Sequence, residues 1–329
     1  MTRLAIIGGG AWGTALALVA RRAGSDATIW ARDSDVVASI DQRHENPAFL
    51  PDIPLDPAIR ATRELADAVA DAEAALIAVP AQFLRDGLVA LGPHLAAAMP
   101  LLLCAKGIET GSLKTMSDVA AELLPRNPLA VLSGPSFAAE VARDLPTAIV
   151  IASRDAALAR DFAAALGSPR FRPYLSEDPV GVELGGAVKN VLAIACGIVD
   201  GLRLGDNARA ALITRGLAEM TRLGVAKGAR AETFAGLSGL GDLVLTCGGA
   251  QSRNHALGQA LGEGNSLEAA LAGRRSVVEG VASAASIAAL ATRLEVEMPI
   301  VASVDAVLHR GMKIRRMMEA LLARPRRAE

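Results

Sequence analysis

The sequence RLAIIGGGAWGTALALVARRA, from Arg3 to Ala23, sets the fold that we predict for the first half of the chain. A short apolar run from Arg3 to Ile7 is typical of a β-strand, and residues 12–23 follow a helical pattern. Three glycines at this junction have the spacing GxGxxG: Gly8, Gly10 and Gly13. A strand, a glycine-rich turn and a helix in this order indicate a dinucleotide-binding unit.

Each of these glycines meets a separate physical need. Gly8 is expected to make the tight turn, Gly10 to let the backbone approach a pyrophosphate, and Gly13 to let helix and strand pack closely. The first turn of the helix then offers free N–H groups and a partial positive charge to the phosphates. The alternative is a glycine-rich turn without a ligand.

The next predicted strand, residues 27–31, is followed by Arg32 and Asp33. An acidic residue at this point binds the ribose 2′-OH of NAD, whereas an arginine accommodates the 2′-phosphate of NADP. Because Arg32 comes first, we favour NADP as the cofactor and expect NAD to be usable. The alternative is a solvated charge pair at the start of a helix.

Short apolar strands alternate with helical stretches up to residue 177. The predicted strands are residues 74–79, 101–104, 129–132, 148–152 and 170–174, and the predicted helices are residues 64–70, 82–91, 113–124 and 156–166. Residues 46–57 contain four prolines, and we expect a loop there. The alternation predicts an α/β fold with a Rossmann-like, doubly wound and mostly parallel sheet. Ligands of such sheets lie beyond the carboxyl ends of the strands, which Lys106, Gly134 and Ser136 follow.

The sequence DPVGVELGGAVKNVLAIACGIVDGL, from Asp178 to Leu202, opens the second half of the chain. Asp178 is typical of a helix N-cap, and apolar residues on every face predict a buried helix. Lys189 lies inside it, and Gly185 and Gly186, one turn earlier, each lower helix propensity by about 1 kcal/mol. Close approach of another backbone or a ligand would explain that loss. We therefore interpret Lys189 as an acid/base lysine beside a substrate, with a lysine that extends to the helix edge as the alternative.

No further strand pattern follows residue 178. Helical patterns cover residues 207–223, 266–271, 280–293 and 299–309. We therefore predict two domains, a Rossmann-like domain of residues 1–177 and an all-helical domain of residues 178–329. Two glycine-rich or polar stretches in the second domain suit a polyanionic ligand: GLSGLGD ends at Asp242, and QSRN places Arg253 where it can clamp a phosphate. A capped turn is the alternative for each.

Composition and charge exclude several classes of function. The net charge of −1 does not indicate a nucleic-acid partner, and the three cysteines and four histidines lack metal or redox spacing. We therefore expect no metal site and a reducing, cytoplasmic location.

Residues 4–20 are uncharged, but consecutive glycines interrupt them, so we expect a soluble protein without stable membrane insertion. Apolar helices in the second domain make a homodimer reasonable. The basic stretch from Arg310 to Arg327 is expected to be a terminal helix with a solvated face, and contact with anionic lipid is the less favoured alternative.

Six motifs in order along the chain carry a family resemblance. They are NPAFLPD (46–52), SGPSFAAE (133–140), GGAVKNV (185–191), GLGDLVLTC (239–247), QSRN (251–254) and VVEG (277–280). Together they resemble NAD(P)-dependent glycerol-3-phosphate dehydrogenase of the bacterial type. The resemblance implies reduction of dihydroxyacetone phosphate, a phosphorylated triose, to sn-glycerol 3-phosphate, the entry to glycerophospholipid synthesis.

The resemblance also implies a role for each matching residue. It implies a catalytic group of Lys189, Asp242 and Thr246, with Lys189 as the general acid/base. The implied substrate-binding residues are Lys106, Gly134, Ser136, Lys189, Asp242, Ser252, Arg253 and Asn254. The implied cofactor-binding residues are Gly8, Gly10, Ala11, Trp12, Gly13, Arg32, Lys106, Ala138, Arg253, Val277 and Glu279.

The proton donor in such a reaction needs a pKa near the working pH. Burial lowers the pKa of a lysine, whereas Asp242 and a substrate phosphate raise it, and we expect burial to dominate for Lys189 in the free protein. Two alternatives stay open. One is a related two-domain nicotinamide dehydrogenase that acts on a hydroxy acid, and the other is a non-catalytic sensor of the dinucleotide redox state.

Overall fold

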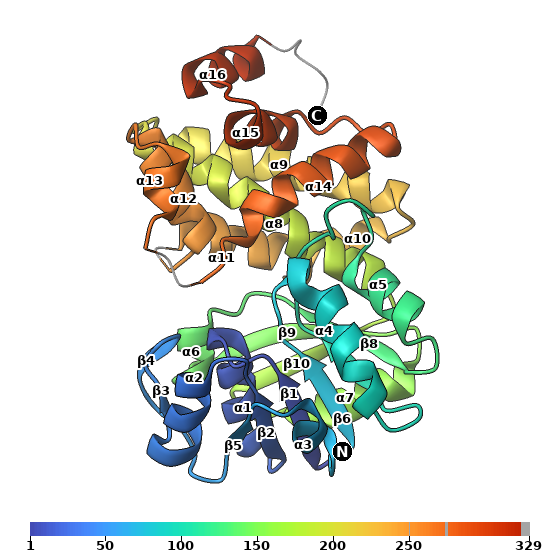
Figure 1. Ribbon diagram of the computed structural model, residues 1–329. Helices are drawn as coiled ribbons and strands as arrows, with labels where there is room; N and C mark the ends of the chain where they lie inside the picture. The colour runs from blue at the N-terminus through green and yellow to red at the C-terminus, as the bar shows by residue number, and fades with distance from the viewer. Residues whose placement is uncertain (250, 274–275, 324–329) are drawn as a thin grey trace.

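The computed structural model describes all residues except 250, 274–275 and 324–329, and it shows two parts stacked on each other (Figure 1). The strands and the helices that flank them form the lower part in this view, and the helices after residue 178 form the upper part. The end of the basic stretch that was predicted to be a terminal helix, residues 324–327, lies outside the described residues.

The lower part is built on one sheet of eight strands in the order β10-β9-β8-β7-β6-β1-β2-β5. All neighbouring strands are parallel except β8 and β9. The strands are β1 (Arg3–Ile7), β2 (Asp26–Trp30), β5 (Arg60–Thr62), β6 (Ala74–Ile77), β7 (Leu101–Leu103), β8 (Leu129–Ser133), β9 (Thr147–Ala152) and β10 (Phe171–Ser176). The predicted mostly parallel sheet is confirmed, and β5 is a strand that the sequence pattern did not reveal.

Helices cover both faces of this sheet because alternate residues of a strand point to opposite sides. Leu4 and Ile6 of β1 belong to one apolar core, and Ala5 and Ile7 belong to another. The helices of this part are α1 (Ala11–Arg22), α2 (Ser34–Ala38), α3 (Leu65–Val69), α4 (Leu84–Leu91), α5 (Met116–Leu123), α6 (Ala138–Ala142) and α7 (Ala156–Leu166), with short turns at Ser39–Arg43, Ala81–Phe83 and Gly92–His94. Helices α1, α6 and α7 pack on the first core, and α3, α4 and α5 pack on the second.

The prediction of a loop over residues 46–57 is wrong. Strands β3 (Glu45–Asn46) and β4 (Leu50–Pro54) form an antiparallel hairpin there. Leu50 and Ile53 are buried in the core under α1, and the Asn46 amide donates to the carbonyl of Gly9 at 2.9 Å. Prolines are tolerated because β4 is an edge strand that pairs only with β3.

The upper part contains only helices among the residues that the structure describes. They are α8 (Pro179–Gly201), α9 (Asp206–Ala226), α10 (Ala231–Ala235), α11 (Asp242–Gly248), α12 (Arg253–Gly262), α13 (Leu267–Leu271), α14 (Glu279–Arg293), α15 (Pro299–His309) and α16 (Ile314–Leu322). The four predicted helical stretches correspond to α9, α13, α14 and α15. The predicted glycine-rich turn before Asp242 is instead a π-helical turn, Leu237–Gly241, that runs directly into α11.

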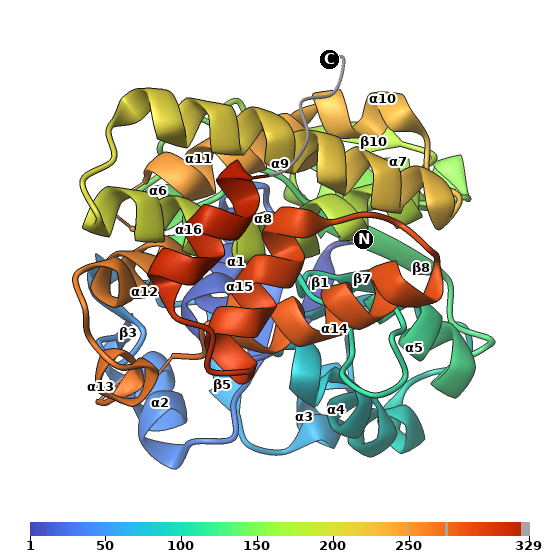
Figure 2. The same ribbon diagram turned by 90° about the horizontal axis from the view of Figure 1, so that it is seen from above.

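Helix α8 lies in the middle of the upper part. Figure 2 shows it from above with α9, α12 and α14 around it, and it contacts each of them. It is the one helix in the described part of the chain that is long and apolar enough to cross a membrane, but its apolar window is entirely buried within the protein. The length and composition of α8 are therefore those of a core helix and do not indicate membrane insertion.

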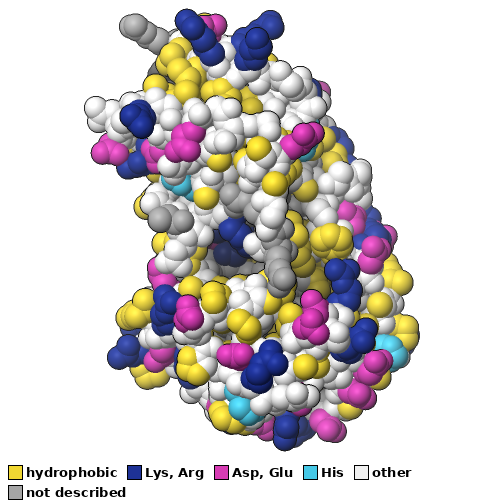
Figure 3. Space-filling model, turned by 60° about the vertical axis from the view of Figure 1, so that its left-hand side comes forward, with side chains coloured by type: hydrophobic (Ala, Val, Ile, Leu, Met, Phe, Trp, Pro, Cys, Tyr) yellow, Lys and Arg dark blue, Asp and Glu magenta, His cyan; other side chains and the backbone are white. Residues whose placement is uncertain are grey.

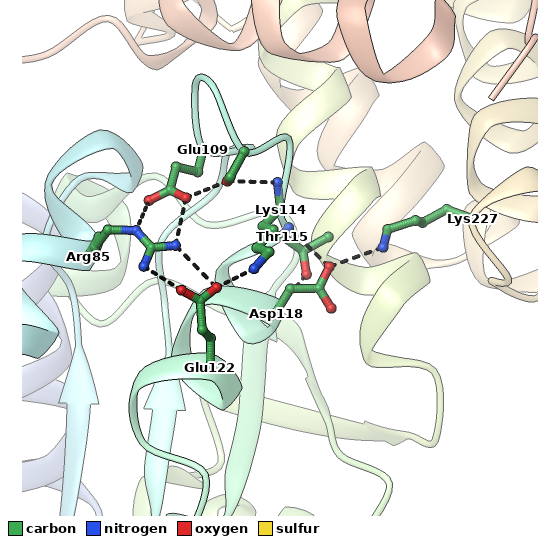
Figure 4. Close-up of polar contacts among 8 residues, drawn as sticks. Arg85, Glu109, Lys114, Thr115, Asp118, Glu122 and Lys227 are labelled. Atoms are coloured by element: carbon green, nitrogen blue, oxygen red, sulfur yellow. Dashed lines mark hydrogen bonds and ion pairs between the residues drawn. The ribbon is translucent and has the colours of Figure 1, made fainter. Parts of the chain in front are cut away.

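Polar contacts hold the two parts together around the first turn of α5. Figure 4 shows an ion-pair network of Arg85, Glu109, Lys114 and Glu122 beside this turn. In the same view Lys227, at the end of α9, donates to Asp118 on α5 at 3.0 Å. The Lys227–Asp118 contact joins the lower part to the helical part, whereas the network around Arg85 lies within the lower part.

Candidate active site

The glycine-rich turn lies where β1 meets α1. Gly8 has a φ of +131°, and a Cβ there would lie 2.8 Å from the carbonyl carbon of Ala78. A Cβ on Gly13 would lie 1.9 Å from the carbonyl oxygen of Gly8, so the turn and the helix are in backbone contact. No described atom lies within 4 Å of a Cβ at Gly10, so the backbone is open to a ligand there. The turn therefore has the shape that a pyrophosphate requires.

Helix α1 begins at Ala11, with Trp12 in its first turn. The first N–H groups of a helix have no partner within the helix and attract phosphate. The indole Nε1 of Trp12 is buried and has no hydrogen-bond partner among the described residues. An orphaned donor beside the open backbone at Gly10 fits a bound dinucleotide.

Glu279 brings a second orphaned atom to the site from the helical part. It is the first residue of α14, and its Oε1 accepts a hydrogen bond from the Ala81 N–H at 3.2 Å. Its Oε2 is buried without a partner in the part of the chain that the structure describes, and burial raises the pKa of this carboxyl. The residues predicted to bind the cofactor therefore contain unsatisfied polar atoms in both parts of the molecule.

The other residues predicted to contact the cofactor lie in different settings. Arg32 is exposed just after β2, whereas Asp33 caps α2 by accepting from the Asp35 N–H at 2.9 Å. Ala138 is the first residue of α6, and Val277 accepts from Arg253 through its carbonyl at 2.8 Å. Both side chains are exposed, and because one carboxylate oxygen of Asp33 is occupied by the cap, Arg32 is the side chain whose charge fits a 2′-phosphate.

Lys189 is buried in the middle of α8, with only 7% of its surface exposed. Its Nζ donates to Oδ1 of Asp242 at 2.5 Å and to the Thr246 hydroxyl at 2.9 Å. Asp242 and Thr246 are one turn apart on α11, so both oxygens point to the same side of that helix. The three residues predicted to be catalytic are therefore in direct contact.

A second lysine reaches the same carboxylate from the sheet. Lys106 follows β7, and its Nζ donates to Oδ2 of Asp242 at 2.8 Å and to the Gly134 carbonyl at 2.9 Å. The Ser136 hydroxyl also donates to this carbonyl, at 2.9 Å. Asp242 is only 1% exposed and lies between the two ammonium groups. Both parts of the chain therefore contribute to one buried cluster.

Charges and burial oppose each other in this cluster. Burial lowers the pKa of Lys189 to about 8, Asp242 raises it, and Lys106 lowers it again. Burial outweighs the carboxylate, as we expect from the sequence. Burial acts to raise the pKa of Asp242, but Lys106 and Lys189 together hold it below its usual range. The result is an ionised carboxylate beside a lysine that can gain or lose a proton near neutral pH.

The three QSRN residues predicted to bind substrate begin α12. Ser252 caps this helix by accepting from the His255 N–H at 3.2 Å, and Arg253 is exposed. Asn254 is buried, and its Nδ2 donates to Oδ1 of Asn190 at 2.9 Å. The structure thus connects Asn254 to the lysine cluster, whereas Ser252 and Arg253 lie at the start of the helix.

Two side chains of the cluster were not predicted from the sequence. The Asn190 amide donates to the Lys106 carbonyl at 3.4 Å, and the Ser133 hydroxyl is buried without a partner among the residues described. Asn190 is a polar residue next to Lys189 in an otherwise apolar helix, and this position could have indicated that it belongs to the site. The sequence gives no comparable indication for Ser133, because a serine at the end of a strand is common.

The cluster lies at the junction between the two parts. Figure 3 shows a hollow between them, with cationic side chains at its base. In the described ranges there is no group of three or more His, Cys, Asp or Glu side chains that could hold a metal ion. A positively charged hollow of this kind suits a small anionic ligand.

Sequence comparison finds one family over both parts. Residues 3–159 match the NAD-dependent glycerol-3-phosphate dehydrogenase N-terminus, and residues 178–319 match the NAD-dependent glycerol-3-phosphate dehydrogenase C-terminus. A relative from Rhodospirillum rubrum named glycerol-3-phosphate dehydrogenase (NAD(P)+) is 56% identical over 99% of this chain and 93% of its own. One of the same name from Caulobacter vibrioides is 57% identical over 99% of this chain and 98% of its own.

The fold comparison agrees with the sequences. The crystal structure of glycerol-3-phosphate dehydrogenase from Coxiella burnetii superposes with a TM-score of 0.95 and 41% identity, and the match covers 98% of this chain and 99% of that one. The glycerol-3-phosphate dehydrogenase of Saccharomyces cerevisiae has a TM-score of 0.81 at 25% identity, over 97% of this chain and 98% of that one. Both parts of the chain, in their relative arrangement, are therefore shared with solved structures.

Proposed function

The chain belongs to the NAD-dependent glycerol-3-phosphate dehydrogenase family, and from this we propose that it interconverts dihydroxyacetone phosphate and sn-glycerol 3-phosphate with NAD(P)H. The observation that supports the reaction best is the buried ammonium of Lys189 between Asp242 and Thr246, in a cluster to which both parts of the chain contribute. The proposed product is a precursor of glycerophospholipids.

Lys189 is the proposed proton donor to the ketone oxygen. Two of the three donors of its ammonium group bond to Asp242 and Thr246, so a third can reach the substrate. When bound, the reduced nicotinamide supplies a hydride to the carbonyl carbon. Asp242 and Thr246 hold the Lys189 ammonium in one position, so it is already oriented for proton transfer when the substrate binds.

Lys106 and Arg253 are the proposed ligands of the substrate phosphate. Lys106 uses two donors on Asp242 and Gly134 and keeps a third for an anion. The Arg253 guanidinium contacts the Val277 carbonyl at 2.8 Å, so it links substrate and cofactor residues. Phosphate binding would orient the ketone toward Lys189.

Each part has a main proposed task, and each also supplies residues to the other's ligand. Residues 1–177 bind the dinucleotide through the turn at Gly8 to Gly13 and through Arg32, and residues 178–329 supply the proton donor and most substrate ligands. We also propose a homodimer, supported by exposed apolar side chains of the helical part such as Val225 and Val244, and a cytoplasmic location, supported by the free, buried cysteines Cys104, Cys196 and Cys247.

Initial rates with NADH and NADPH, side by side and with dihydroxyacetone phosphate as substrate, test this function. We expect consumption of both cofactors and a preference for NADPH because of Arg32. The same assay with a panel of 2-oxo acids separates this reaction from that of a hydroxy-acid dehydrogenase. Absence of steady NAD(P)H consumption with dihydroxyacetone phosphate would refute the proposal and favour a dinucleotide sensor.

The Lys189→Ala variant tests the proton donor. We expect a loss of about 10²-fold to 10⁴-fold in kcat, the range for a general acid, with NADPH binding retained. Lys114→Ala is the matched control, because Lys114 pairs with Glu122 at the surface and lies outside the cluster. Wild-type turnover by Lys189→Ala would remove this lysine from the mechanism.

A further inference from the structure

The side chain of Lys106 lies directly on the backbone of α8 at Gly186. A Cβ on Gly186 would lie 3.2 Å from Cγ and 3.4 Å from Cδ of Lys106, and 2.8 Å from the Ser133 hydroxyl. Gly186 is buried in the middle of the helix, where a glycine costs about 1 kcal/mol relative to alanine. The room that its missing side chain leaves is filled by the Lys106 stem and by Ser133.

Lys106 is held at two other points, one on the same face of α8 and one on α11. Gly186, Lys189 and Asn190 are spaced i, i+3 and i+4, so they share one side of the helix. The Asn190 amide holds the main chain of Lys106 at 3.4 Å, and Asp242, which binds Lys189, holds its ammonium group at 2.8 Å. Gly186 lies beneath the stem between these two ends.

We propose that Gly186 is a positioning residue for Lys106: because α8 has no side chain at this position, the Lys106 stem lies against the helix and its ammonium group reaches the carboxylate that also holds Lys189. This inference rests on the proposed function for the role of Lys106 in turnover. The neighbouring Gly185 differs, because a Cβ there would lie 2.4 Å from the Ser238 carbonyl oxygen and would disturb backbone packing instead.

A displaced Lys106 changes the charge around Lys189. The charged groups that face Lys189 are Asp242 from α11, which raises its pKa, and Lys106 from the loop after β7, which lowers it. If Lys106 moves away, the lowering effect weakens and the pKa of Lys189 rises. Loss of burial at Lys189 would raise this pKa as well, so the double-mutant cycle with Lys106→Ala separates the two causes.

The Gly186→Ala variant tests the inference. We expect kcat for ketone reduction to fall by about tenfold to a hundredfold, the scale of a misplacement of about 1 Å, and the pKa seen in the kcat profile to rise. Gly87→Ala is the matched control, because Gly87 is also helical but its Cβ would meet only Val79, at 3.7 Å. Wild-type kcat and pH profile for Gly186→Ala would overturn the inference.

A double-mutant cycle with Lys106→Ala separates this inference from the proposed function. If Gly186 acts through Lys106, Gly186→Ala causes no further loss in the Lys106→Ala background, whereas additive losses show an independent role and refute the inference. If Gly186→Ala alone does not fold, the Ser133→Ala/Gly186→Ala variant removes the closest atom, and we expect it to fold and to regain part of kcat. A wild-type protein inactive on dihydroxyacetone phosphate would refute the proposed function instead.

Discussion

The buried ammonium of Lys189 lies within hydrogen-bond distance of Asp242 and Thr246, and burial lowers its pKa to about 8. A lysine in solution, with a pKa of about 10.4, would hold its proton too firmly to act as an efficient acid at neutral pH. The helix around Lys189 supplies the apolar walls, and Asp242 prevents the charge from being lost entirely. Desolvation, the carboxylate of Asp242 and the neighbouring ammonium of Lys106 therefore set the proton affinity of Lys189.

This balance predicts opposite pH profiles for the two directions of the reaction. Ketone reduction needs protonated Lys189, so kcat should fall as the pH rises through about 8, whereas alcohol oxidation needs the neutral amine and should rise there. Steady-state rates in both directions between about pH 6 and pH 10 would show the two limbs. Asp242→Asn removes the group that raises the pKa of Lys189. The residual ketone reduction of this variant should therefore fall at a lower pH than that of the wild type. Parallel profiles in the two directions would contradict the assignment.

Helices α8 and α12 cross with their backbones in contact. A Cβ on Gly258 of α12 would lie 2.0 Å from the Ile194 carbonyl oxygen, and one on Gly197 of α8 would lie 2.0 Å from the His255 carbonyl oxygen. Helix α12 carries Arg253 at its start, so the crossing sets the distance between this guanidinium and Lys189. The packing of α8 against α12 thus controls how Arg253 and Lys189 are placed in the site.

We predict that Gly258→Ala forces these two helices apart. Overpacking of this kind costs about 1–3 kcal/mol, and the shift of Arg253 should also raise KM for dihydroxyacetone phosphate. Urea unfolding and substrate titration measure the two effects. Gly248→Ala is the control, because no described atom lies within 4 Å of a Cβ there. An unchanged KM in a destabilised Gly258→Ala protein would show that α12 does not position the phosphate ligand.

The elements that the sequence predicts well are those with a local signal. The glycine spacing after β1 and the apolar pattern of α8 are local, and both elements agree with the structure. The hairpin of β3 and β4 was missed because burial against α1 outweighs its prolines, and this contact joins Asn46 to Gly9 across 37 positions. Lys106 and Asp242 are 136 positions apart, so no spacing rule could pair them; their positions placed each near a ligand, and the family resemblance placed both near one substrate.

At the scale of the whole molecule, Glu183 joins the two parts from within the core. It lies on α8, is 3% exposed, and accepts from the backbone N–H of Ser117 on α5 at 2.7 Å and from the Ser117 hydroxyl. Burial raises the pKa of this carboxyl to about 7, although both contacts with Ser117 act to lower it. Glu183 therefore gains or loses its proton near physiological pH in the folded protein, whereas in the unfolded chain it is already ionised there.

The raised pKa of Glu183 predicts how stability depends on pH. Between pH 4.5, its ordinary pKa, and about 7 the folded state holds a proton that the unfolded state has released, so its contribution to stability falls as the pH rises and is constant above about 7. The difference in pKa corresponds to a loss of about 3 kcal/mol. Glu183→Gln cannot titrate, so its stability relative to the wild type should increase by this amount from about pH 5 to pH 8, measured by urea unfolding. Glu122→Gln is the control, because arginine and lysine contacts hold the pKa of that exposed carboxyl at about 2, outside this range. A constant stability difference between wild type and Glu183→Gln across these pH values would show that Glu183 stays ionised at the junction and that the contacts from α5 outweigh its burial.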